Sequence, residues 1–167
     1  MKLYLLRHAE AEEAKDASPR AEASRALTSR GRRKVRSLAH ALRELDIRVE
    51  FVWTSPLTRA RQTAEIVVRG LRLARPPLAV EALLPDRKPE EVVAELERLR
   101  PLPETMLWVG HEPHLSRLIA FLVTGHSDGA EIVVKKCGLC RLELDTIRSG
   151  RCARLEWLIP PRWFAGD

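Results

Sequence analysis

The sequence predicts an α/β fold, a three-layer α/β/α sandwich whose central sheet is mixed but mostly parallel. Between residues 2 and 125, short apolar segments alternate with segments whose apolar residues recur at helical spacing, an order typical of parallel sheets covered by helices. After residue 125 the pattern changes to strands alone, which fits edge strands added to that sheet. The length of 167 residues suits one domain, so we expect a single domain over residues 1–167 with one active site.

The N-terminal part of the chain predicts a strand, a loop and a helix. Residues 2–6 form an apolar run suited to a buried strand. Residues 11–24 are polar and predict a surface loop that lies near the end of this strand. Thr28 then offers a helix cap, and apolar residues recur at helical spacing from there to about residue 45.

The middle of the chain predicts three further strands, each followed by a helix. The predicted strands are residues 51–53, 78–80 and 106–109. The predicted helices run from Pro56 to Leu71, from Pro89 to Leu99 and from Glu112 to about Gly125. A proline suits the first turn of a helix because the N–H that it lacks has no partner within the helix there.

The C-terminal quarter predicts strands at residues 131–134, 139–144 and 152–158. Lys135 and Lys136 fit either a charged edge strand that discourages aggregation or a contact with an extended anionic substrate. Three cysteines also lie in this part of the chain. Their odd number and late position do not suit a secreted disulfide framework, and Cys137 and Cys140 lack a second pair at metal-site spacing, so we expect reduced thiols.

The composition limits the partners that we expect. No apolar run is long enough to span a membrane and no leader segment precedes the first strand, so we expect a cytoplasmic protein without a membrane partner. The net charge of +6 would attract polyanions. The 23 arginines are nevertheless spread along the chain and aromatic residues make up only 5%, so we expect no nucleic-acid partner.

Chemically unusual residues follow three of the predicted strands. Arg7 and His8 follow the first predicted strand. Ser55 follows the strand over residues 51–53, and Arg59 lies one helical turn after Ser55. His111 follows the strand over residues 106–109. Ligands of open α/β sheets bind outside the carboxyl ends of the strands, so we expect these residues to converge. Two arginines and two histidines beside helix N-termini would bind a phosphoryl group well.

The same segments resemble the motifs of a known family. Leu6-Arg7-His8-Ala9 resembles the Arg-His-Gly/Ala signature of the histidine phosphatase superfamily, and the segments 55–63 and 109–113 resemble its second and third motifs. Leu27-Thr28-x-x-Gly31, the short chain and Ala9 are similar to the SixA-type phosphohistidine phosphatase branch. The resemblance covers about residues 2 to 145 and implies a phosphoglycerate mutase-like fold.

The resemblance also implies roles for single residues. His8 matches the nucleophile, which would carry the phosphoryl group as a covalent phosphohistidine. Arg7, Arg59 and His111 match the residues that bind the equatorial oxygens in the transition state. Arg25 matches a basic substrate-binding position, and Ser55 is expected to cap a helix and support the substrate site. The scheme requires no metal and no cofactor.

The general acid is the point at which the sequence departs from many members of the superfamily. Glu81 and Asp86 are the candidates after the third strand, but neither lies in a decisive motif. A phosphohistidine substrate needs little help from an acid, because imidazole, with a pKa of about 6.5, leaves more readily than an alkoxide.

The sequence therefore predicts a phosphatase that acts most naturally on protein phosphohistidine. Alternatives are hydrolysis of a phosphoanhydride such as polyphosphate or a nucleotide, and a non-catalytic module that binds phosphate or phosphohistidine. The intact His8 favours the enzyme over the binding module. Nucleic-acid binding would predict that the protein retains duplex or single-stranded nucleic acid in a salt-sensitive way and that His8→Ala does not change this retention.

Overall fold

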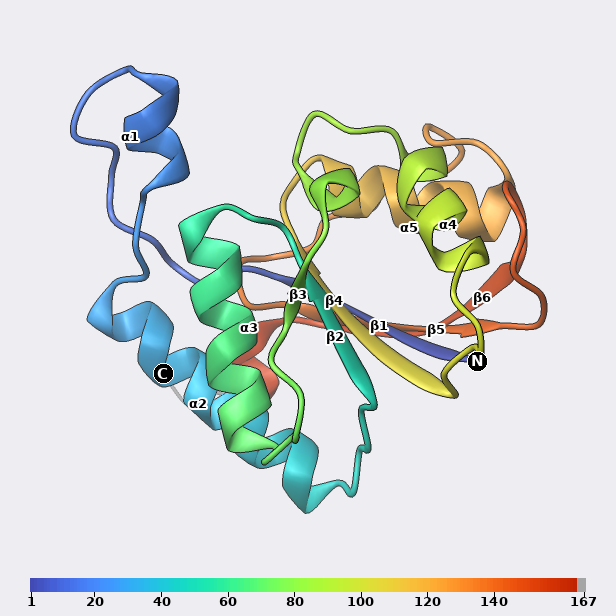
Figure 1. Cartoon of the computed structure of the whole chain (residues 1–167), viewed down its shortest axis with the longest axis horizontal. Helices are drawn as coiled ribbons and strands as arrows, with labels where there is room; N and C mark the ends of the chain where they lie inside the picture. Colours follow the sequence, from blue (N-terminus) through green and yellow to red (C-terminus); the bar gives the residue numbers. More distant parts are fainter. Residues whose placement is uncertain (165–167) are drawn as a thin grey trace.

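The structure is a computed structural model, and it describes residues 1–164. Six strands form one sheet in the order β3-β2-β4-β1-β5-β6 (Figure 1). The strands are β1 (Lys2–Arg7), β2 (Phe51–Thr54), β3 (Leu78–Ala79), β4 (Thr105–Gly110), β5 (Leu139–Leu144) and β6 (Ala153–Ile159). The first four pair in parallel, whereas β5 and β6 are antiparallel additions at one edge. This confirms the predicted mixed sheet.

Helices cover both faces of the sheet. The helices are α1 (Pro19–Ala23), α2 (Ser29–Glu44), α3 (Thr58–Gly70), α4 (Pro89–Glu97) and α5 (His114–Thr124), with short 3-10 turns η1 (Glu81–Leu83) and η2 (Pro161–Trp163). Helices α2 and α3 cover one face, and α4 and α5 cover the other (Figure 1). The three-layer arrangement is therefore the one that the sequence predicts.

The alternation of side chains along β1 accounts for the two cores. Leu3 and Leu5 pack into the core beneath α4 and α5, while Tyr4 and Leu6 pack into the core beneath α2 and α3. Successive side chains of a strand point to opposite faces, so one short apolar strand supports both layers. Trp53 and Trp108 stack across β2 and β4 with ring centroids 5.3 Å apart.

The structure corrects four predictions at the level of elements. Residues 11–24 are not all loop, because Ser18 caps the short helix α1 and accepts a hydrogen bond from the Ala21 amide. Helix α3 begins at Thr58 and not at Pro56, and α5 begins at His114 and not at Glu112.

The fourth correction concerns the predicted strand over residues 131–134, which pairs with no other strand. Residues 131–134 have no regular secondary structure and pass beside the end of β1, where Arg7 Nη1 donates to the Val134 carbonyl. Lys135 and Lys136 therefore lie in an exposed turn and not on an edge strand.

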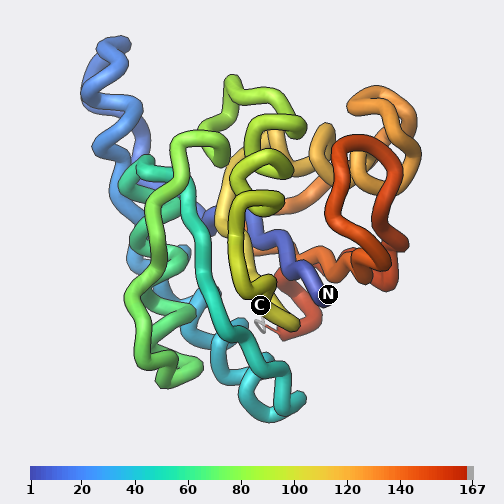
Figure 2. The backbone as a smooth tube through the Cα atoms, turned by 45° about the vertical axis from the view of Figure 1, so that its right-hand side comes forward, coloured from blue at the N-terminus to red at the C-terminus, as the bar shows by residue number. Residues whose placement is uncertain are grey.

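Helix α1 stands away from the rest of the molecule, as the tube in Figure 2 shows. None of its residues is buried, in contrast to the other helices. Its attachment to the body therefore depends on polar contacts, which are described with the site. Within the described part of the chain, no helix has the length and apolar character needed to cross a membrane.

Candidate active site

The ends of β1, β2 and β4 bring the predicted site residues together. Arg7 pairs in register with Gly110, and the backbone amide of His8 donates to the Gly110 carbonyl at 3.1 Å. The amide of Ser55 donates to the Val109 carbonyl at 2.9 Å. Because these three strands are parallel and adjacent, the residues that follow them meet at one edge of the sheet.

Two hydrogen bonds hold the His8 ring with its proton on Nδ1 and a lone pair on Nε2. Its Nδ1 lies 2.7 Å from the Ala9 carbonyl, which only accepts hydrogen bonds, so Nδ1 carries the proton. Arg59 Nε donates to His8 Nε2 at 3.3 Å, which requires a lone pair on Nε2. Both contacts select the same tautomer. Burial lowers the pKa of His8 to about 4, and the charges of Arg59, Arg7 and Lys136 act in the same direction.

His111 lies beside His8, with ring centroids 4.9 Å apart and planes inclined by 52°. Burial lowers the pKa of His111 to about 2, and the neighbouring His8 contributes in the same direction. Neither ring nitrogen of His111 has a hydrogen-bond partner among residues 1–164. A neutral, unpartnered imidazole at this position can donate a hydrogen bond to an oxygen bound next to His8.

Arg7 is held by a hydrogen bond and by a nearby carboxylate. Its Nη1 donates to the Val134 carbonyl at 2.9 Å. Glu112 accepts from the Val134 amide at 2.8 Å and also from the Ser116 hydroxyl. Burial lowers the pKa of Arg7, while the charge of Glu112 opposes that shift. Glu112 thus fixes the segment that orients Arg7, a role that sequence reasoning missed because residues 131–134 were interpreted as a strand.

Arg59 is nearly buried and is held by Glu22 of α1. Arg59 Nη1 donates to the Glu22 carbonyl at 3.0 Å, and Nη2 lies 3.1 Å from the Glu22 carboxylate. Burial lowers the pKa of Arg59, and the Glu22 charge opposes this shift. Sequence reasoning missed Glu22 because it treated residues 11–24 as a loop, although Ser18-Pro19 is a helix-start signal.

Arg25 contacts the Glu22 carboxylate, which also contacts Arg59. Its Nη1 contacts both carboxylate oxygens of Glu22 at 3.1 Å, and its Nε donates to the Glu12 carbonyl at 2.7 Å. Glu22 therefore links the guanidinium groups of Arg25 and Arg59. An anion that binds at Arg59 would come close to Arg25 as well.

Ser55 and Thr63 support the turn into α3. Ser55 is fully buried, and its Oγ accepts from the Leu57 amide at 3.4 Å. The Thr63 hydroxyl donates to the Arg59 carbonyl at 2.7 Å and accepts from the Ala9 amide at 3.3 Å. These contacts fasten the start of α3 to the segment that carries His8.

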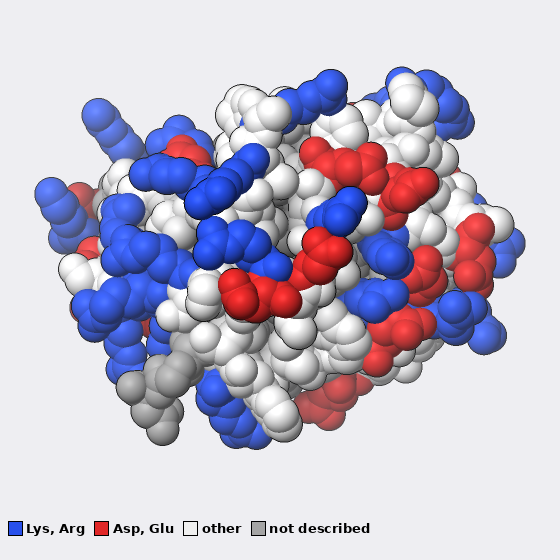
Figure 3. Space-filling model, turned by 90° about the horizontal axis from the view of Figure 1, so that it is seen from below, with Lys and Arg blue, Asp and Glu red and all other residues white. Residues whose placement is uncertain are grey.

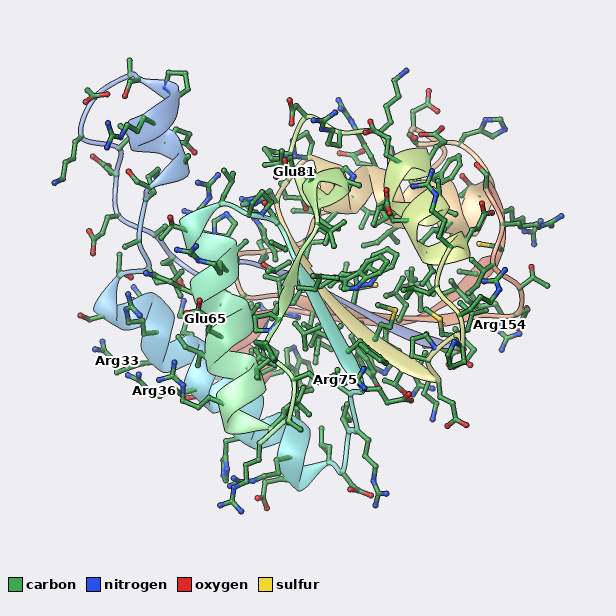
Figure 4. The ribbon with its side chains drawn as sticks, viewed as in Figure 1. Arg33, Arg36, Glu65, Arg75, Glu81 and Arg154 are labelled. Atoms are coloured by element: carbon green, nitrogen blue, oxygen red, sulfur yellow. The ribbon has the colours of Figure 1, made fainter. Side chains whose placement is uncertain are left out.

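The candidate acids, Glu81 and Asp86, are both exposed. Glu81 begins η1 and is exposed (Figure 4). Asp86 is exposed as well, and its charge acts weakly on His114, whose pKa is lowered mainly by burial. Neither carboxylate forms a hydrogen bond or ion pair with His8, Arg7, Arg59 or His111 among the described residues. Within that same part of the chain, no three His, Cys, Asp or Glu side chains form a group that could hold a metal ion.

Comparisons with known proteins agree with this geometry. Residues 3–88 match the family model described as histidine phosphatase superfamily (branch 1). An uncharacterized protein of Picosynechococcus sp. is 34% identical over 169 residues, which cover 98% of each chain.

Two solved structures indicate the fold. The protein histidine phosphatase SixA, complexed with tungstate, has a TM-score of 0.82 and 27% identity over 96% of this chain and 97% of its own. The alpha-ribazole phosphatase from Shigella flexneri has a TM-score of 0.67 and 20% identity over 96% and 97%. The phosphoglycerate mutase-like fold expected from the sequence is confirmed. The chain belongs to the histidine phosphatase superfamily.

Proposed function

We propose that this protein hydrolyses phosphohistidine in proteins, and that His8 carries the phosphoryl group as a covalent intermediate. One observation carries this proposal: Arg59 Nε donates a hydrogen bond to His8 Nε2 at 3.3 Å. The pKa of this His8 imidazole is lowered to about 4, so the ring is neutral near pH 7. A neutral ring nitrogen beside a guanidinium group is both a nucleophile and part of an anion site. The likeness to SixA supports the phosphohistidine substrate.

The proposed reaction has two balanced steps. In the first, His8 Nε2 forms a bond to phosphorus while the bond from phosphorus to the substrate imidazole breaks, and that imidazole takes up a proton from a general acid or from water. In the second, water attacks phosphorus, the bond to Nε2 breaks, and inorganic phosphate leaves. Arg7, Arg59 and His111 bind the three equatorial oxygens, where negative charge is spread in the transition state. Hydrogen bonds to the Val134 and Glu22 carbonyls hold Arg7 and Arg59 before the substrate arrives, which lowers the cost of reorganisation.

The remaining proposed roles concern the substrate and the acid. Arg25 would bind the substrate through the anion site that it shares with Arg59, while Ser55 would support that site by holding the turn into α3. Glu81 and Asp86 stay the candidates for the general acid, although in the described residues neither forms a hydrogen bond or ion pair with the residues at His8. A weak acid suits phosphohistidine, whose imidazole leaves readily. The proposed unit is one domain over residues 1–167.

A phosphoanhydride such as polyphosphate or a nucleotide is the second candidate substrate, and one observation favours it. The chain carries a net charge of +6, and the positive charge of Lys136 acts directly on His8. Such charge attracts substrates that bear several phosphates.

A phosphate-release assay separates these candidates. Wild type and His8→Ala would be compared on a protein phosphorylated on histidine, on polyphosphate and on p-nitrophenyl phosphate. We expect the highest kcat/KM on the phosphohistidine protein and a loss of at least about 10³-fold in His8→Ala. Preference for polyphosphate would support the second candidate, and the absence of turnover on every substrate would indicate a non-catalytic binding module.

A further inference from the structure

A groove lined mainly by basic side chains lies between α2 and α3. We call it the arginine groove; it is lined by Arg36, His40, Arg43, Ile66, Arg69 and Gly70 and has a volume of about 310 Å³. Gly70 makes the groove possible, because a Cβ there would lie 2.5 Å from the Ala39 Cβ. The two helices therefore cross closely at this point, and the basic side chains flank the crossing.

The positive charges of the arginine groove are poorly compensated. In the described part of the chain, Arg36 and Arg69 form no ion pair, and Arg43 contacts only His40 Nδ1, at 3.4 Å. Glu44 lies 3.9 Å from His40 of the groove and Glu65 pairs with Arg61 at 3.7 Å, but among the described residues none of the three groove arginines pairs with a carboxylate. Like charges that share a hollow repel one another, and an external anion would relieve that repulsion.

Helix stability explains only part of this arrangement. Arg43 and Arg69 lie in the last turns of α2 and α3, where a cation interacts favourably with the helix dipole. Arg36 lies in the middle of α2 and gains nothing from either helix end. Its side chain projects from α2 at the same edge of the molecule as that of Arg33 (Figure 4). Viewed from below, Lys and Arg side chains gather on this side, whereas the opposite side mixes both signs (Figure 3).

The arginine groove is too far from His8 for a small substrate to reach. Arg59 and Arg69 are ten residues apart on α3, which corresponds to about 15 Å along the helix. A phosphorylated side chain bound at His8 could contact the groove only if the rest of a macromolecule extended along α3. A protein substrate could therefore contact both His8 and the groove, whereas a small molecule could contact only one of them.

The surfaces on both flanks of α2 favour a protein, rather than polyphosphate or nucleic acid, as the ligand of the arginine groove. Ile66 contributes an apolar surface to the arginine groove. A second, largely apolar groove borders the other flank of α2, where the side chains of Leu45 and Trp163 are 70% and 72% exposed. A protein surface that carries both carboxylates and apolar side chains can use both regions, whereas a polyphosphate chain can use only the charges.

We propose that the arginine groove is a docking surface for the acidic surface of a phosphorylated protein, whose phosphohistidine then reaches His8. This inference rests on the proposed function and adds to it the class of protein substrate. Arg36, Arg43 and Arg69 bind carboxylates of the partner, since guanidinium groups pair with carboxylates in a two-pronged geometry. Docking therefore lowers KM for acidic protein substrates and leaves the chemical step unchanged.

The test compares a groove variant with a variant of equal charge. The groove variant is Arg36→Gln/Arg43→Gln/Arg69→Gln. The control is Arg98→Gln/Arg151→Gln/Arg154→Gln. It removes three exposed arginines: one just after α4, one in the loop before β6 and one in β6, where Figure 4 labels Arg154. Substrates are an acidic histidine-phosphotransfer domain and a basic protein, both phosphorylated on histidine with phosphoramidate, and free phosphohistidine.

We expect the groove variant to raise KM for the acidic domain by about tenfold, with kcat unchanged and with values for free phosphohistidine within about twofold of wild type. The control should resemble wild type at about 150 mM salt. Equal KM values for the acidic domain in wild type and groove variant would overturn the proposal, as would equal losses in the groove and control variants. Stronger competition by polyphosphate or RNA than by poly-L-glutamate, abolished in the groove variant, would also overturn it in favour of a polyanion.

A binding measurement separates this inference from the proposed activity. The His8→Ala variant, with and without the three groove substitutions, would be titrated with the fluorescently labelled acidic domain, so that no turnover is needed. Weaker binding in the groove variant supports docking even if the wild type fails to hydrolyse phosphohistidine. Hydrolysis of every phosphohistidine substrate with equal binding by both variants would overturn docking and leave the proposed activity in place.

Discussion

The chemistry of His8 depends on which of its ring nitrogens carries the proton. The Ala9 carbonyl fixes the proton on Nδ1, and Arg59 directs a donor at Nε2. Burial adds a second condition, since it disfavours the charged imidazolium. Side chains and backbone therefore act together to keep Nε2 of His8 neutral, as the proposed nucleophile requires.

The protonation of His8 is directly measurable. We expect the imidazole of His8 to titrate near pH 4, well below the value of about 6.5 for a free histidine. Nitrogen-15 NMR of the imidazole signals, assigned with His8→Ala, would report the titration and also the tautomer. A midpoint near 6.5, or a proton on Nε2, would contradict this description of the site.

Glu22 offers a second test at a single residue. Its carboxylate lies 3.1 Å from Arg59 Nη2, on the guanidinium to which we assign a phosphoryl oxygen, so we expect substrate and Glu22 to compete for Arg59. We expect Glu22→Gln to lower the inhibition constant for inorganic phosphate by about fivefold, because one competing charge is lost. Glu13→Gln removes the same charge from the same exposed segment and should leave that constant unchanged. Weaker phosphate inhibition in Glu22→Gln would mean that Glu22 instead orients Arg59.

The start of α2 packs against the backbone of the segment that follows His8. The Thr28 hydroxyl caps this helix by accepting from the Gly31 amide at 2.9 Å. A Cβ on Gly31 would lie 2.3 Å from the Glu10 carbonyl oxygen. The helix thus packs directly against the backbone two residues after His8.

Gly31→Ala should therefore damage both stability and the site. We expect a loss of about 1–3 kcal/mol in the free energy of unfolding, because backbone must move to accept the methyl group. Urea denaturation would measure this loss, with Ser29→Ala in the same turn as a control. An unchanged unfolding midpoint in Gly31→Ala would show that this close approach does not constrain the fold.

The limits of sequence reasoning also appear at the level of elements. The strands β1, β2 and β4 and the helix α2 were predictable, because their apolar spacing is governed by local geometry. Residues 131–134 have strand-like composition, but their partners are Arg7 and Glu112, which only the tertiary structure brings near. Glu22 was missed because residues 11–24 were interpreted as a loop, and its contact with the distant Arg59 appears only in the tertiary structure.

At the scale of the whole molecule, the parallel strands explain why the central site residues were predictable. Arg7, His8, Arg59 and His111 follow strand ends that any parallel sheet brings to one edge. The order of the strands was not predictable, because the apolar pattern of a buried strand does not specify its neighbours. Glu81 and Asp86 remained ambiguous because their segment follows the very short strand β3.

Three buried histidines, His8, His111 and His114, have lowered pKa values and make the stability of the molecule depend on pH. His8 and His111 have folded-state pKa values of about 4 and about 2, below the unfolded value of about 6.5. The unfolded chain therefore binds more protons below pH 6.5, and stability falls as the pH falls. Between pH 7 and pH 5 we expect a loss of about 2 kcal/mol for each of His8 and His111. Urea unfolding at both pH values would measure it, and equal stability at both would contradict the burial of neutral imidazoles.

The central claim is that the phosphoryl group passes through His8. Rapid quenching of wild type with a protein carrying ³²P-phosphohistidine, followed by mass spectrometry of the enzyme, tests this most directly. We predict an acid-labile, base-stable phosphate on His8 that forms and decays at the rate of turnover and is absent in His8→Ala. Turnover without label on His8, or turnover retained in His8→Ala, would contradict the account.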